Sequence, residues 1–208
     1  MTPSRARRQA ILDAAYPLFG TQGFDKTSMA QIAARVGGSK ATIYSHFGSK
    51  EQLLVECLVL AAGNYMAGTL ALLDRPGSLD ARPVLETFGQ DFLGLACSPL
   101  SVAVKRLLIA EASRRDLGKA LFAKLTELRA QVGQLLSGLV RTGALRVDDA
   151  NLAATHLRAL LESEILEPLL LNARDTPPDR LEIEQAAHRA VRAFLRCYGQ
   201  AGHPRVKT

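Results

Sequence analysis

The chain has 208 residues, of which 48% are hydrophobic and 22% are charged, and its formal net charge is +6. These proportions are typical of an ordinary soluble globular protein that buries a sizeable core. No apolar run approaches the ~18 residues that a membrane-spanning helix requires. The apolar residues near the N-terminus recur at helical spacing and are interrupted by Asp13. We therefore expect no signal peptide, a cytoplasmic location and no membrane partner.

The positive charge is concentrated at the N-terminus. Residues 1–50 carry seven Lys and Arg against two Asp, whereas residues 51–208 carry 19 basic and 18 acidic side chains. A basic first quarter on a near-neutral remainder indicates a polyanion-binding head on a body with another role.

Every long segment repeats its apolar residues with a period near 3.6, which predicts an all-α chain of about nine helices. Glycines or proline-containing breaks separate them. In chain order, the expected spans are residues 4–22, 28–36, 40–47, 49–73, 81–97, 100–114, 117–143, 147–171 and 177–198.

The second and third of these helices have the sequence pattern of a helix-turn-helix. Ser28 and Gln31 fit a capping box, Gly37-Gly38 makes the turn, and Ser39 caps the short third helix. Apolar Ile43 and Phe47 are expected to face inward. Polar and small side chains are expected outward, and they are Lys40, Ala41, Thr42, Tyr44, Ser45 and His46. By pattern alone, a plain helical hairpin with a half-buried Tyr44 is the competing interpretation.

Residues 7–54 resemble the N-terminal domain of the TetR family of transcriptional regulators. The segments that carry the resemblance are Arg8–Ala15, Leu18-Phe19, Gly23-Phe24, Thr27–Met29, Ile32-Ala33, Val36–Phe47 and Ser49-Lys50-Glu51-x-Leu53. One departure is Gly38, where the family often has valine. The resemblance implies an all-helical homodimer with a three-helix DNA-binding domain, placed at residues 1–52. A helical ligand-sensing and dimerisation domain then follows, at residues 53–208.

Carried over position by position, the resemblance places the contacts with a double-stranded DNA operator on the start of helix two, the recognition helix and the start of helix four. These residues are Thr27, Ser28, Ser39, Lys40, Ala41, Thr42, Tyr44, His46 and Lys50. We expect Lys40 and Ala41 to face base edges and the others to hold phosphates or cap helices. Arg5, Arg7 and Arg8 either reach the duplex or form a solvated basic tail, and the sequence leaves both open.

The body is expected to sense a small molecule and to dimerise. An apolar or aromatic effector, with Glu111 and His156 as polar anchors, fits the candidate pocket residues, although each is also an ordinary core residue by pattern. They are Phe88, Phe92, Leu93, Cys97, Leu107, Leu108, Glu111, Phe122, Leu125, His156 and Leu160. The expected dimer interface uses two C-terminal helices through Leu152, Ala159, Leu166, Leu170, Ala187, Ala190 and Phe194.

Enzymatic chemistry and cofactors find no support in the sequence. Gly48-Ser49-Lys50 lacks the spaced first glycine of a phosphate-binding loop, and the four histidines have no metal-ligand spacing. Three cysteines predict reduced thiols, with Cys97 the better candidate for a redox sensor. We expect a ligand-responsive repressor of a pseudo-palindromic operator. The alternative is a helical lipid or small-molecule carrier without DNA binding.

Overall fold

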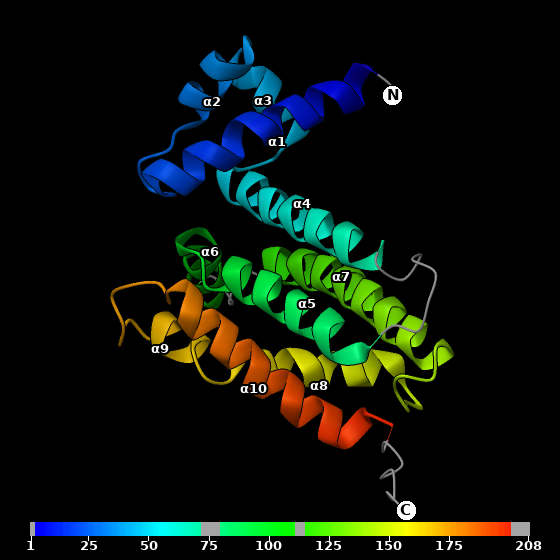
Figure 1. Ribbon diagram of the computed structural model, residues 1–208. Helices are drawn as coiled ribbons and strands as arrows, with labels where there is room; N and C mark the ends of the chain where they lie inside the picture. The colour runs from blue at the N-terminus through cyan, green and yellow to red at the C-terminus, as the bar shows by residue number, and fades with distance from the viewer. Residues whose placement is uncertain (1–2, 72–79, 111–114, 201–208) are drawn as a thin grey trace, which may run out of the picture.

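The structure is a computed structural model, and it describes residues 3–71, 80–110 and 115–200. The elements of these residues are ten helices (Figure 1): α1 (Pro3–Gln22), α2 (Met29–Val36), α3 (Lys40–His46), α4 (Lys50–Leu70), α5 (Ala81–Ala96), α6 (Pro99–Ala110), α7 (Arg115–Arg141), α8 (Ala150–Glu162), α9 (Leu166–Leu170) and α10 (Arg180–Tyr198). None of these helices is long and apolar enough to cross a bilayer. The all-α prediction is confirmed.

Helices α1–α3 form a head at one end of the molecule, over the start of α4 (Figure 1). Their apolar faces meet in one core, in which Ile11, Phe19, Ile32, Ile43 and Phe47 are each at most 1% exposed. Burying one side chain of this size contributes roughly 1.5–3 kcal/mol. The short α3 therefore depends for its position on the residues it buries against α1 and α2.

The body is built from α5, α7, α8 and α10 around a second core. Leu85, Leu135, Leu157, Val191 and Phe194 are all 1% exposed or less in it. Helix α10 packs against both α5 and α8, and α7 packs against α8.

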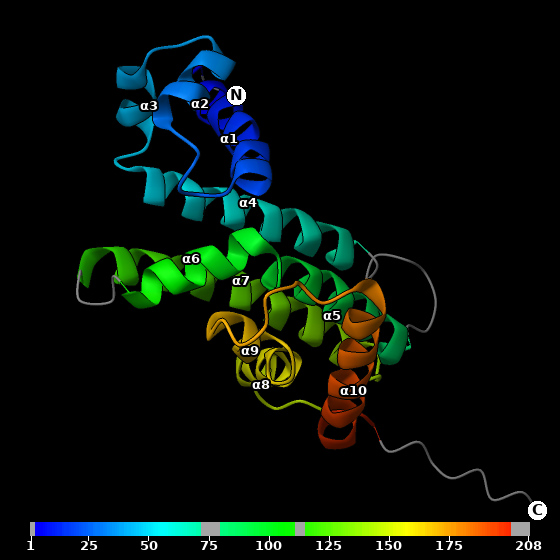
Figure 2. The same ribbon diagram turned by 90° about the vertical axis from the view of Figure 1, so that its left-hand side faces the viewer.

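Helices α4 and α6 lie between the head and the rest of the body (Figure 2). The first turns of α4 bury Leu53, Leu54 and Cys57 in the head core, and its later turns pack on α5 and α7. Leu100 and Val104 of α6 also belong to the head core. The predicted domain boundary at residues 52 and 53 thus falls inside one continuous helix.

One expected helix, residues 147–171, is two helices in the structure. Residues 163–165 form a turn between α8 and α9. In a continuous helix the Pro168 ring would clash with the carbonyl of Glu164, four residues earlier, and Pro168 has no N–H to donate to it. The prediction of about nine helices missed this break because the apolar period continues through it.

Candidate DNA-binding surface and ligand cavity

Local interactions set the geometry of the turn between α2 and α3. The Ser28 hydroxyl accepts from the Gln31 backbone N–H at 3.2 Å, and the Gln31 side chain accepts from the Ser28 N–H at 2.8 Å. The predicted capping box is therefore confirmed. Gly37 follows α2 with φ of 68°, in the left-handed region that favours glycine. Ser39 then caps α3 by accepting from the Thr42 N–H at 3.1 Å.

Helix α3 has one buried side and one open side. Ile43 and Phe47 hold it in the head core, while Tyr44 is 50% exposed. Helix α3 contains no acidic residue, so its open side presents an ammonium group, hydroxyl groups and an imidazole. Such groups donate to phosphate oxygens and to base edges in the major groove. The exposed or half-buried residues are Lys40, Ala41, Thr42, Tyr44, Ser45 and His46.

Thr27 is buried, and this corrects its predicted contact with DNA. The side chain is 1% exposed, and its hydroxyl is 2.7 Å from the Gly23 carbonyl and 3.2 Å from the Leu18 carbonyl. A hydroxyl held in this way ties the end of α1 to the start of α2. The prediction that it reaches the duplex is wrong for this structure, whereas the neighbouring Ser28 is exposed.

Lys50 is also committed to partners within the head. Its ammonium group donates to the Phe24 carbonyl at 2.9 Å and to the Thr27 carbonyl at 3.1 Å. The same group lies 4.1 Å from the centroid of the Phe24 ring, a cation–π distance. The predicted phosphate contact would require these bonds to break, so Lys50 here fastens α4 to the loop before α2.

Two N-terminal arginines brace the head, a role that the sequence analysis did not consider. The Arg7 guanidinium donates to the carbonyls of Val36 and Gly37 at 3.3 and 3.2 Å, at the C-terminal end of α2. A Cβ on Gly38 would lie 2.3 Å from Arg7 Nη2. The departure from valine at position 38 thus makes room for this side chain. Arg8 pairs with Glu56 at 3.1 Å.

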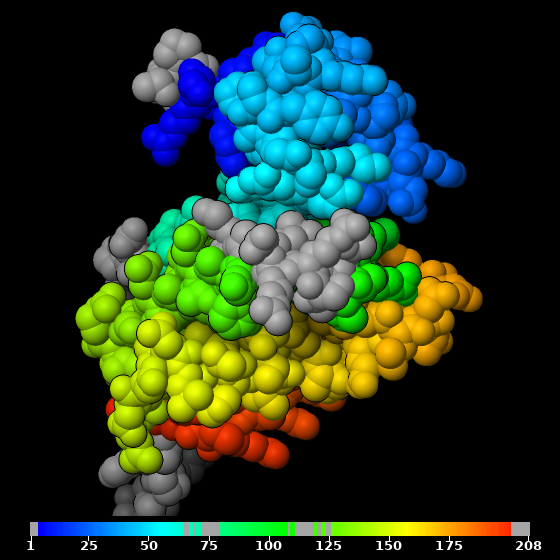
Figure 3. Space-filling model, turned by 180° about the vertical axis from the view of Figure 1, so that it is seen from behind, coloured from blue at the N-terminus to red at the C-terminus, as the bar shows by residue number. Residues whose placement is uncertain are grey.

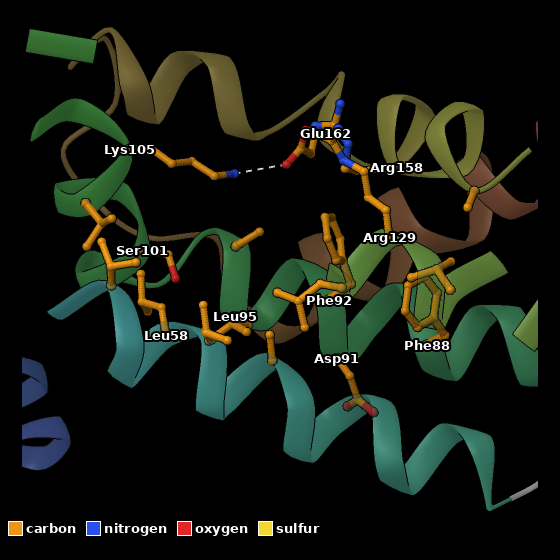
Figure 4. Close-up of a pocket in the computed structure, with 18 residues that line it drawn as sticks. Leu58, Phe88, Asp91, Phe92, Leu95, Ser101, Lys105, Arg129, Arg158 and Glu162 are labelled. Carbon is orange, nitrogen blue, oxygen red and sulfur yellow. Dashed lines mark hydrogen bonds and ion pairs between the residues drawn. The ribbon is translucent and has the colours of Figure 1, made fainter. Parts of the chain in front are cut away.

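A cavity of about 220 Å³ lies in the body (Figure 4). Five helices line it, from α4 to α8, and most of the lining side chains are apolar. Its apolar lining includes Leu58 and Val59 of α4, Phe88 and Phe92 of α5, and Val132 of α7. A concave, mostly apolar site with few polar groups is the usual form of a small-molecule site.

The polar groups of the cavity lie on two sides. Lys105 of α6 donates to Glu162 of α8 at 2.9 Å, and Arg158 makes a second, short bond to the same carboxylate. Figure 4 shows Arg129 close to this group in the view and Asp91 on the opposite side, next to α4. Burial raises the pKa of the Asp91 carboxyl group above its ordinary value.

Two of the predicted pocket residues, Phe88 and Phe92, line this cavity. Of the other predicted residues, those whose side chains the structure describes do not line it, for different physical reasons. Leu93 and Cys97 are buried in the body core, Leu160 packs against that core, and Leu107 is half-buried elsewhere on α6. Phe122 is 60% exposed and lies beneath Arg129. His156 is exposed and bonded to the Tyr198 hydroxyl at 2.6 Å. Glu111 and the side chains of Leu108 and Leu125 lie outside the described residues.

Comparison with known proteins gives the same assignment for both parts of the chain. Residues 11–57 match the family described as bacterial regulatory proteins, tetR family. Residues 83–200, more than half of the chain, match the C-terminal domain of AefR-like transcriptional repressors. The chain belongs to the TetR family. It is therefore a DNA-binding transcriptional regulator and not an enzyme.

Several TetR-family relatives match nearly the whole chain. The transcriptional regulator BetI of Rhizobium meliloti is 28% identical over 200 residues, which cover 95% of this chain and 94% of that protein. A crystal structure of a TetR-family regulator from Mesorhizobium loti has a TM-score of 0.75 at 27% identity and covers 96% of this chain and 100% of that one. The flavonoid-responsive regulator FrrA has a TM-score of 0.58 at 25% identity and covers 94% and 98%.

The predicted dimer residues of this TetR-family chain separate into two groups. Leu166, Ala187, Ala190 and Phe194 are at most 4% exposed within a single protomer, so their side chains are not available to an interface and this part of the prediction is wrong. Leu170 packs against the same core but is only half-buried, so its assignment stays a prediction. The apolar face of α10 meets α5 and α8 of its own chain. Leu152, which is 51% exposed, and Ala159 remain open on α8. Figure 3 shows α8 as a broad strip across the rear surface, with α10 along its lower edge.

The contribution of α4 to the cavity was not predicted, although its sequence carries a signal. Val55, Leu58, Val59 and Ala62 follow the spacing i, i+3, i+4, i+7, which marks one apolar helix face. This face adjoins that of Leu53 and Leu54 in the head core, and Val55 belongs to both. The polar members of the cavity had a weaker signal, the i, i+4 pair of Arg158 and Glu162 among the apolar residues of the second half of α8.

The cysteines do not form a redox centre at the cavity. Burial raises the pKa of the Cys57 thiol to about 12 and that of the Cys97 thiol to about 11. Both thiols are therefore protonated at neutral pH, and a protonated thiol is a poor nucleophile. Cys197 is exposed, near the C-terminal end of α10.

Proposed function

We propose that this TetR-family regulator is a repressor that binds a pseudo-palindromic operator as a homodimer and leaves it when a small, largely apolar effector occupies the cavity. The open side of α3 is the recognition surface of each protomer. Lys40 and Ala41 face base edges, and Thr42, Tyr44 and His46 hold phosphates. Two such helices in a twofold dimer read two half-sites about one or more DNA turns apart.

The proposed response to a ligand is supported by two residues that line the cavity and also belong to the head core. Val55 of α4 and Val104 of α6 both line the cavity, and both are buried members of the head core. An effector that packs against these side chains changes the contacts that position the head. The binding free energy of the effector then differs between the head position that fits DNA and other head positions. Such a difference is the requirement for a population shift.

The relatives support the two parts of the proposal through their names. The family matched by residues 83–200 is described as repressors, and FrrA is described as flavonoid-responsive. The relatives of this chain thus include repressors and a regulator that responds to a small molecule. The carrier without DNA binding gains no support, since the basic head and the polar side of α3 are both present.

The double variant Thr42→Ala, Tyr44→Ala tests the recognition surface. Both side chains contribute hydroxyl donors on the open side of α3, and neither is part of the core. We expect operator affinity to fall by roughly 100-fold or more, because each protomer of the dimer loses charge-assisted hydrogen bonds to phosphate. The measurement is fluorescence anisotropy with DNA from upstream of the protein's own gene, or with a duplex selected from a random pool.

Thr126→Ala is the matched control, since Thr126 is an exposed hydroxyl of α7 that bonds to the Phe122 carbonyl of its own helix. It should leave operator affinity unchanged. Wild-type affinity in the double variant would refute the assignment of the recognition surface. A wild-type protein that takes up apolar ligands but binds no selected duplex would instead support the carrier.

A further inference from the structure

The charges at one side of the cavity do not balance. Three cationic side chains, Lys105, Arg129 and Arg158, line the cavity together with the single carboxylate of Glu162 on that side. Glu162 accepts from both Lys105 and Arg158 and so is already shared. Among the described residues, Arg129 has no hydrogen bond or carboxylate partner, and its guanidinium only lies 5.2 Å from the centroid of the exposed Phe122 ring.

Arg158 has an unused donor at the same place. Its Nε is buried, and no hydrogen-bond acceptor lies within reach of it among the described residues. A buried donor without a partner is costly. Because this Nε is closed off from the open volume of the cavity, the Arg158 side chain must turn for an acceptor on a ligand to reach it. A guanidinium group that is short of an acceptor is matched best by a carboxylate, which can accept two parallel N–H bonds.

The opposite side of the cavity offers a weaker polar anchor. Asp91 is the single acidic residue there, and burial raises the pKa of its carboxyl group. Burial disfavours the charged form of this single carboxyl group, so it attracts a cation less than the two guanidinium groups opposite attract an anion. The side with Arg129 and Arg158 therefore provides the stronger selection by charge.

We propose that the effector is a small amphipathic carboxylic acid. Its carboxylate binds Arg129 and Arg158, and its apolar body lies against Leu58, Val59, Phe88 and Phe92. This inference rests on the proposed function, because it names the chemical class of the molecule that the cavity senses. The cavity volume of about 220 Å³ is below the roughly 300–1,000 Å³ of common ligand sites, which favours a compact acid.

A matched set of probes distinguishes the contribution of the carboxylate charge to binding from that of the apolar chain. Hexanoate, octanoate and decanoate are titrated into the full-length protein by calorimetry, followed by octanol and by octyltrimethylammonium. We expect at least one acid to bind, octanol to bind about tenfold or more weakly than octanoate, and the ammonium compound to bind more weakly still. The acid that binds best should also release the wild-type protein from its operator.

Two cavity variants locate the carboxylate. Arg129→Gln removes the charge but keeps a polar, shorter side chain, and it should weaken binding of the acid about tenfold while leaving the affinity for octanol unchanged. Asp91→Asn should not weaken the acid. Arg192→Gln, on the exposed side of α10, is the control and should change neither affinity. Operator binding without ligand shows that each variant is folded.

Equal affinity for octanoate and octanol, tighter binding of the ammonium compound with loss in Asp91→Asn, or no binding of any acid would overturn the inference. In each of these cases wild-type operator binding would still stand, and the proposed function with it. Failure of the ligand-free protein to bind any selected duplex would instead refute the proposed function, whatever the probes do.

Discussion

Gly38 has no side chain, and the Arg7 guanidinium occupies the space that a Cβ would fill. Arg7 comes from the first turns of α1 and donates to the last carbonyls of α2, which no N–H of that helix can satisfy. Gly38 has no positive φ, so its backbone does not require glycine. Space for the Arg7 guanidinium is the reason that remains.

We predict that Gly38→Val lowers the free energy of unfolding by about 1 kcal/mol, because Arg7 must leave its two carbonyls. A drop of that size lowers Tm by roughly 2–4 °C in a chain of this length. In an Arg7→Ala background the same substitution should be neutral or stabilise the protein by about 0.4–1 kcal/mol, since it restricts the unfolded chain. Thermal unfolding of the four proteins gives the coupling. An equal effect in both backgrounds would mean that the two residues are independent.

At the scale of elements, features decided within a few residues could be predicted from the sequence. The capping box of Ser28, the cap of Ser39 and the buried positions of Ile43 and Phe47 all agree with the structure. Features that depend on distant partners could not be predicted. An apolar face such as that of α10 looks the same whether it meets its own chain or another. Likewise, a lysine such as Lys50 does not reveal that its acceptors lie 23 and 26 residues away.

The contact between α6 and α9 is one of these distant features. Arg106 of α6 donates to the carbonyls of Leu169 and Leu170 and, at 2.9 Å, to the Asn172 side chain. Asn172 has φ of 57°, a left-handed conformation that asparagine tolerates better than most residues. One guanidinium group thus satisfies the end of the short α9, whose five residues are too few to be stable alone.

We predict that Arg106→Ala loosens α9 and lowers the free energy of unfolding by about 1–2 kcal/mol, because these carbonyls lose a charged donor. Hydrogen exchange of a peptide covering residues 166–172 should accelerate, while exchange in the head stays unchanged. Arg180→Ala removes an ion pair of a 93% exposed side chain on α10 and serves as the control. Unchanged exchange in Arg106→Ala would show that α9 is held by its apolar contacts alone.

At the scale of the molecule, the proposed binding to two half-sites requires two heads at a fixed separation. The dimer interface must therefore use residues that are not already buried in the cores of each protomer. The buried face of α10 is not available for it. Helix α8 keeps Leu152, His156 and Ala159 exposed at the spacing i, i+4, i+7, so one open stripe runs along it. Because Leu152 is apolar and Ala159 is small, this stripe allows close approach of a second copy by twofold symmetry.

We predict that the double variant Leu152→Glu, Ala159→Glu raises the dissociation constant of the dimer by about 100-fold or more, because buried charges without partners are costly. Sedimentation velocity over a range of concentrations measures this directly. The same variant should lose most of its affinity for the full operator, since a single head makes only half of the contacts. Leu171→Glu, at a 71% exposed position after α9, is the control and should sediment like the wild type. Unchanged dimerisation in the double variant would move the interface away from the stripe on α8.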